Sequence, residues 1–65
     1  MAAVQALLFF MNTMFGGATT LSPVQQQMLM TSPQYQTVMM TNPDAVAVKP
    51  AQGGNVVVII DHSEL

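Results

Sequence analysis

The sequence predicts a small α+β chain without an independent core, extended in shape and stabilised by partner proteins. Three observations predict this class: apolar residues at helical spacing near the N-terminus, prolines in phase through the middle, and valine-rich runs near the C-terminus. The chain has 65 residues, and chains of this size bury only about 60 % of their unfolded surface. We therefore treat residues 1–65 as one non-autonomous unit with segments 1–17, 18–43 and 44–65.

The first segment, residues 1–17, is predicted to form a hydrophobic helix. Apolar residues recur on one helical face at spacings of three and four positions: Val4, Leu7, Leu8, Met11 and Phe15. Gly16 and Gly17 follow, and glycine commonly ends a helix. Polar residues on the opposite side are few, and a helix that is apolar nearly all round is usually buried on most sides.

The same region leaves open a membrane interpretation, in which residues 1–21 form a marginal span or an interfacial anchor. No residue in this stretch carries a charged side chain. A helix ending at Phe15 would be roughly 22 Å long, however, whereas the hydrocarbon core is about 30 Å thick. Gln5, Asn12 and the lack of a flanking basic residue also weigh against a span.

Residues 18–43 contain three prolines in the same phase, Pro23, Pro33 and Pro43. Each follows a residue that caps helices well, and proline is favoured at the first helical position; these capping residues are Ser22, Ser32 and Asn42. Gln25 stands at the capping-box spacing from Ser22. We expect short helical turns that begin at the prolines. The alternatives are an extended segment through residues 34–41, which contain strand-favouring residues, and chance phasing in a low-complexity stretch.

Residues 44–65 carry the clearest strand signal. Two runs, residues 45–48 and 56–60, are joined by a connection that contains proline and a glycine pair, which predicts a β-hairpin. The second run is apolar without alternation, which is typical of a strand covered on both faces, and so short a chain supplies little cover. This run is either a buried strand of a local hairpin or a strand that joins the sheet edge of a partner.

Charge is scarce and confined to the last third of the chain. Charged residues make up 6 % of the sequence, the net charge is −2, and residues 1–43 have no charged side chain. Ordinary domains are about 25 % charged. Nucleic acid is excluded as a partner because one cation, Lys49, cannot neutralise a row of phosphates. The neutral stretch is expected to lie against other proteins.

No catalytic, metal or cofactor site is predicted. Asp61, His62, Ser63 and Glu64 include the residue types of a hydrolytic triad. Neighbours in an extended segment point to opposite faces, however, and cannot form that arrangement. One imidazole with carboxylates lacks the ligand spacing of a metal site, and the chain has no cysteine. Its methionines have no accompanying His or Cys for copper and are interpreted as apolar filling.

These observations favour a structural or accessory subunit of a large protein assembly, with a virus particle as the expected type, in its capsid or tail and in many copies. The expected partners are larger subunits of the same assembly, contacted by helix packing and strand addition. The predicted interface consists of Val4, Leu7, Leu8, Met11, Phe15, Val56, Val57, Val58, Ile59 and Ile60. A membrane-anchored protein is the second hypothesis. A self-assembling fibre is the third, because residues 56–60 and the Gln-rich middle favour cross-β stacking.

Overall fold

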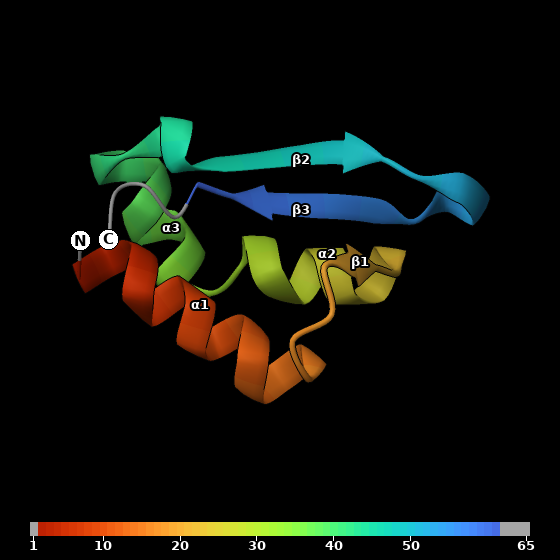
Figure 1. The fold of residues 1–65 in the computed structure, drawn as a ribbon, viewed down its shortest axis with the longest axis horizontal. Coiled ribbons are helices and arrows are strands. Elements are labelled where there is room, and N and C mark those ends of the chain that lie inside the picture. The colour runs from red at the N-terminus through yellow and green to blue at the C-terminus, as the bar shows by residue number, and fades with distance from the viewer. Residues whose placement is uncertain (1, 62–65) are drawn as a thin grey trace.

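Figure 1 shows the computed structural model, which describes residues 2–61. Within these residues the chain forms three α-helices: α1 (Ala2–Phe15), α2 (Pro23–Met30) and α3 (Pro33–Thr41). A three-stranded antiparallel sheet consists of β1 (Thr20–Leu21), β2 (Val46–Pro50) and β3 (Val56–Ile60). Single 3-10 turns occupy Pro43–Ala45 and Gln52–Gly54. The prediction of a small α+β fold is confirmed.

Helix α1 uses the predicted periodic face for the core. Its buried residues are Val4, Leu7, Met11 and Phe15. The helix ends where Gly16 and Gly17 adopt φ angles of 63° and 81°, a left-handed conformation that glycine adopts without steric cost. After this pair the chain turns back towards the sheet and forms β1 (Figure 1).

Helices α2 and α3 begin at Pro23 and Pro33, as the proline phasing predicts. The capping box at α2 is present: the Gln25 N–H donates to Ser22 Oγ at 3.2 Å, and the Ser22 N–H donates to Gln25 Oε1 at 3.0 Å. Because residues 33–41 are helical, the extended alternative for residues 34–41 is wrong.

The third proline unit ends the helical part of the chain. Pro43 begins a single 3-10 turn, so the predicted helical turn at this proline is present, but Asn42 makes no side-chain capping bond to it, and the prediction of a cap at Asn42 is wrong. The Val46 N–H bonds to the Pro43 carbonyl, and the chain enters β2 at once. The physical reason is the alternation of alanine and valine after this turn, which favours a strand over a further helix.

Strand β3 lies in the centre of the sheet, in the order β1-β3-β2. Val58 pairs with Val48 of β2, and Val57 pairs with Thr20 of β1. The predicted hairpin of the two valine-rich runs is thus confirmed. Strand β1 was not expected, because a strand of two residues shows no periodicity and exists only through its pairing with β3.

The helices cover one face of this sheet and leave the other open. Side chains alternate along a strand, and Val48, Val56 and Ile60 pack against the core on the same side as Val58. On the opposite side Ile59 is 47 % exposed. We call this side the outer sheet face; it consists of Ala47, Lys49, Val57 and Ile59.

The chain has a buried cluster of its own, which corrects the expected extended shape. Its radius of gyration is 10.9 Å, and its extents are 32 × 20 × 18 Å. The cluster draws on every layer of the fold: Val4, Leu7, Met11, Phe15, Leu21, Leu29, Val38, Ala45 and Val58. Each element alone has little cover, but β3 pairs with two strands and brings their side chains over the helices. Stabilisation by partners remains a proposal.

Candidate functional site

The structure divides the predicted interface residues into a buried and an accessible set. Five of them lie in the chain's own core with exposed fractions of 8 % or less: Val4, Leu7, Met11, Phe15 and Val58. In this fold they present little surface to another protein, and only Met11 and Val58 among them line a cavity. Leu8, Val56, Val57 and Ile60 are half-buried, and Ile59 is exposed. The accessible part of the predicted interface is therefore mostly strand β3.

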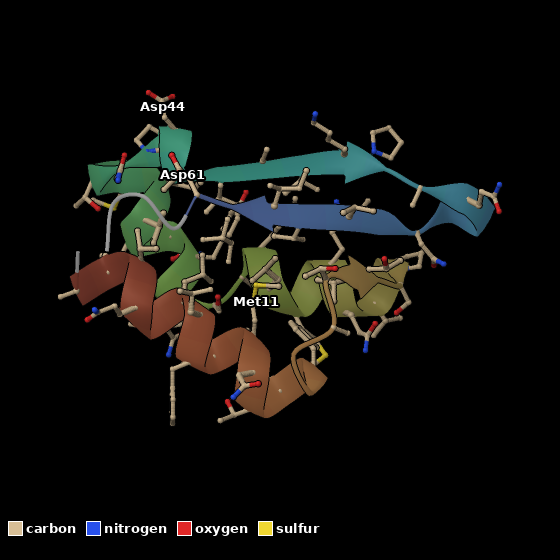
Figure 2. All side chains as sticks on the ribbon, in the orientation of Figure 1. Met11, Asp44 and Asp61 are labelled. Carbon is tan, nitrogen blue, oxygen red and sulfur yellow. The ribbon has the colours of Figure 1, made fainter. Side chains whose placement is uncertain are left out.

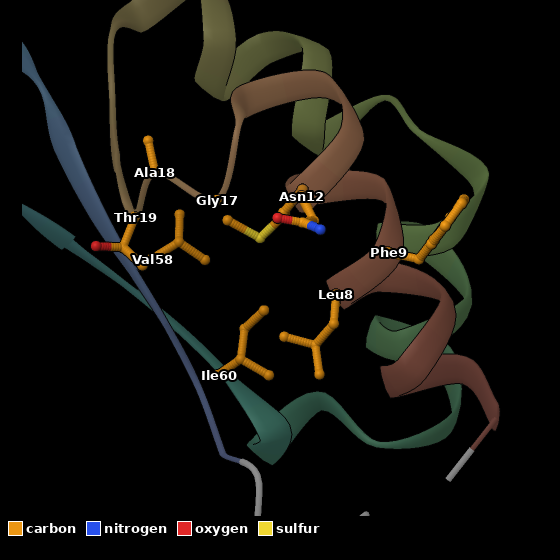
Figure 3. Close-up of a pocket in the computed structure, with 9 residues that line it drawn as sticks. Leu8, Phe9, Asn12, Gly17, Ala18, Thr19, Val58 and Ile60 are labelled. Carbon is orange, nitrogen blue, oxygen red and sulfur yellow. The ribbon is translucent and has the colours of Figure 1, made fainter.

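A cavity of about 380 Å³ lies between α1 and β3 (Figure 3). Leu8 of α1 and Ile60 of β3 point towards each other across it. Its lining comes from α1, from the connection to β1 and from β3, and consists of Leu8, Phe9, Met11, Asn12, Gly17, Ala18, Thr19, Val58 and Ile60.

The path of the chain after α1 explains this cavity. The Gly17 N–H donates to the Met11 carbonyl at 3.4 Å, which keeps the chain close to the end of the helix. Thr19 is where the chain reaches the sheet, and its carbonyl accepts from the Val58 N–H at 2.8 Å. Before Thr19 the chain does not follow β3, so the space beside Ile60 stays open.

The lining of the cavity is uncharged and largely apolar. Its polar side chains are the amide of Asn12 and the hydroxyl of Thr19. A Cβ atom added to Gly17 would lie 3.2 Å from Asn12 Oδ1, so the glycine allows the amide to pack closely against the chain. Phe9 borders the cavity, but its ring is 70 % exposed and points away from Leu8 and Ile60 (Figure 3). Ligand sites commonly measure about 300–1,000 Å³, and this one suits an uncharged group.

Sequence reasoning did not find Phe9, Ala18 or Thr19 as site residues. Phe9 lies outside the periodic face that defines the buried side of α1. Ala18 and Thr19 belong to a connection with no pattern of its own, and they reach the cavity only because β1 pairs with β3. The signal that could have pointed to Phe9 was a large aromatic residue on the more polar side of the helix.

The charged residues that the structure describes lie in the turn before β2, in β2 and directly after β3. They are Asp44, Lys49 and Asp61, and Figure 2 shows Asp44 and Asp61 at the same end of the hairpin. Residues 2–43, which form the helices and β1, carry no charged side chain. The helical layer therefore offers apolar and amide groups at its surface but no charged side chain that could form an ion pair.

Neither a metal centre nor a membrane span emerges from the part of the chain that the structure describes. Residues 2–61 contain no cluster of three His, Cys, Asp or Glu side chains that could hold a metal ion. None of the helices in this range is long and apolar enough to cross a bilayer. The hydrolytic residue types considered at His62, Ser63 and Glu64 lie outside the described residues.

Comparison of the chain with protein-family models, with curated proteins and with solved structures finds no match. Three features of the molecule itself bear on its function. These are the uncharged helical layer, the outer sheet face and the cavity between α1 and β3.

Proposed function

We propose that this chain is a non-enzymatic structural subunit of a large protein assembly, with a virus particle as the type of assembly. It occurs there in many copies and contacts larger subunits. One observation carries the proposal: large apolar side chains are exposed on a chain that has almost no charge. They lie on all three helices and on β3, at Phe9, Met14, Val24, Met28, Met40 and Ile59.

These exposed side chains are significant because the chain has so few charged residues. Single exposed apolar residues are normal on soluble proteins, whose surfaces are about 25–35 % charged. Here Met40 is 84 % exposed, and residues 2–43 offer no charge to keep neighbouring molecules apart. A surface of this kind is stable in water when other proteins cover it, which supports a role as an assembly subunit.

Two parts of the structure suit such contacts. The outer sheet face presents Val57 and Ile59 beside the small Ala47, with Lys49 at its border. Helix α1 presents Phe9, and aromatic rings are common anchors of protein interfaces. Packing on the helix and pairing with the sheet are the contact modes that we propose for the neighbouring subunits.

Sedimentation of the native source material tests this proposal. The material is treated with mild non-ionic detergent, and the chain is followed by mass spectrometry. We expect the chain to sediment with a dense, detergent-resistant particle at a fixed ratio to larger proteins, and crosslinking then identifies its neighbours. Recovery in the micellar fraction would instead support the membrane-anchored alternative and contradict an assembly subunit.

A substitution on the outer sheet face tests the contact itself. Ile59→Thr keeps a β-branched side chain and removes exposed apolar surface, so we expect a several-fold lower incorporation in competition with the unchanged chain. Thr37→Ser serves as the control, because it removes one methyl group from an exposed helical position and keeps the hydroxyl that bonds to Pro33. Equal incorporation of both variants would exclude the outer sheet face as a contact.

A further inference from the structure

The edge of β3 that faces the cavity has backbone groups without partners in the sheet. Along an antiparallel strand, successive residues direct their N–H and C=O groups to alternate sides. The Asp61 N–H bonds to the Ala45 carbonyl on the β2 side, and the Val58 N–H bonds to the Thr19 carbonyl on the β1 side. Ile60 therefore directs its N–H and C=O towards the β1 side. Strand β1 pairs only with Val56 and Val57, so within residues 2–61 the ladder offers Ile60 no partner there.

The other edge of the sheet is partly protected. The register leaves only Val48 pointing its N–H and C=O outward from β2, between two protected positions. On the outer side of β2, the Val46 N–H already bonds to the Pro43 carbonyl, and Pro50 has no N–H to donate. Lys49 adds a charge to the same strand. Proline and lysine are devices that prevent unwanted pairing at sheet edges. Val58 to Ile60 of β3 contain neither proline nor a charged residue, and the first charge is that of Asp61, which directly follows Ile60.

We infer that an extended, uncharged segment of a partner protein pairs with β3 at Ile60 and occupies the space between β3 and α1. This inference rests on the proposed function, since the partner is a neighbouring subunit of the assembly. The added strand continues the row that β1 begins, on the same side of β3. It hydrogen-bonds to the Ile60 N–H and C=O, and its inward side chains lie among Leu8, Val58 and Ile60.

The chemistry of the cavity determines what the segment is. An added strand gains affinity from main-chain hydrogen bonds and specificity from its alternate side chains. None of the lining residues carries a charge, so a lysine or glutamate that pointed inward would lose hydration without gaining a partner. The segment therefore has small or medium-sized uncharged side chains at its inward positions.

Amide hydrogen exchange in the free chain provides the first test. Ile59 directs its N–H towards Ala47 of β2, whereas the Ile60 N–H faces the cavity. We expect the Ile60 amide to exchange roughly tenfold faster or more than the Ile59 amide, because exchange reports local protection. Equal protection of the two amides at low chain concentration would show that Ile60 already has a partner and would overturn the inference.

A capped peptide of alternating threonine and valine provides the second test. The probe is N-methylated at alternate amides along one edge, which prevents self-association and leaves the other edge free to pair. We expect it to slow exchange at Ile60 and to shift the NMR signals of Leu8 and Ala18. The control peptide is methylated along both edges and should lose these effects. If both peptides act alike, the cavity binds apolar groups without strand pairing, and the inference is wrong.

Two variants locate the binding. Leu8 points into the cavity, whereas Ala47 lies on the outer sheet face. Leu8→Phe places a larger side chain in the space and should abolish protection of Ile60 by the peptide, and Ala47→Phe should retain it. The inference would be wrong if both variants lost the protection of Ile60 by the peptide. It would also be wrong if protection of Ile60 rose with chain concentration without peptide, because a second copy of the chain would then occupy the edge. These tests use the purified chain, so their failure is distinct from a failure to sediment with a particle.

Discussion

Helices α2 and α3 begin with the same Ser-Pro pair, yet they bury different positions of their repeat. In the first unit the fully buried residue is Leu29, in the ninth position counted from Leu21. In the second it is Val38, in the eighth position counted from Thr31. The repeat thus determines where each helix begins, and the packing of each helix determines which side is buried.

The two capping serines differ in the same way. Ser22 is half-buried and makes a local capping box with Gln25. Ser32 is 6 % exposed; its hydroxyl donates to the Leu29 carbonyl at 2.6 Å and accepts from the Tyr35 N–H at 3.2 Å. One side chain thus ends α2 and begins α3. The Ser-Pro motif thus provides a local helix cap at Ser22 and a buried link between two helices at Ser32.

The largest difference between α2 and α3 should appear when the residue in the ninth position of each unit is truncated. Burial of Leu29 is complete, so Leu29→Ala is expected to lower the free energy of unfolding by about 2–5 kcal/mol. Domains of this size have about 3–5 kcal/mol in total, so little folded chain should remain. Met39→Ala, at the equivalent but half-buried position, should retain the fold.

Urea unfolding followed by circular dichroism measures both variants, and the milder Leu29→Val provides a free energy of unfolding that can be measured. Similar losses from Leu29→Val and Met39→Val would contradict the assigned faces.

Aspartate at the two capping serines should separate their roles. Aspartate caps helices as well as serine does, so Ser22→Asp is expected to change stability by less than about 0.5 kcal/mol. In Ser32→Asp the carboxylate can accept from Tyr35, but it cannot donate to the Leu29 carbonyl and is buried beside it. We expect a loss of about 2 kcal/mol. Thermal melting at neutral and acidic pH measures the effect, which should shrink in acid because a protonated carboxyl donates again. A neutral Ser32→Asp would refute the double role of this hydroxyl.

Replacement of the two prolines should have the smallest effects and the most similar ones. Pro23 and Pro33 both occupy the first turn of their helices, where proline restricts the unfolded chain without removing a needed N–H. Pro23→Ala and Pro33→Ala are each expected to lower stability by about 0.4–1 kcal/mol. Melting temperatures of the two variants should agree closely. A large difference would show that the repeat also specifies tertiary packing.

The helix starts and the hairpin were predictable from the sequence because they depend on local chemistry. Proline after serine fixes the beginnings of α2 and α3, and two valine-rich runs around a turn predict β2 and β3. The buried face of α1 was also predictable, since Val4, Leu7 and Met11 share one side of a regular helix. These signals require no knowledge of what packs against them.

The compact shape and the candidate site were not predictable in this way. Strand β1 has two residues, and its existence depends on Val56 and Val57, far along the chain. The cavity depends on where Gly17 and Thr19 direct the connection between α1 and the sheet. The same tertiary packing places Val4 and Val58 in the interior, so an apolar pattern alone could not tell core from interface.

The central position of β3 has a consequence for biosynthesis. The strand order is β1-β3-β2, so the two strands that are translated first share no ladder with each other. Thr20 must wait for Val57 before it pairs, and contacts so distant in the chain form slowly. A nascent chain that ends before Val56 lacks the central strand and forms no sheet, so core residues such as Leu29 and Val38 stay without their cover. The sheet of this protein therefore forms late and in one step, after β3 has been translated. Until then, chaperones that bind apolar segments have access to the chain.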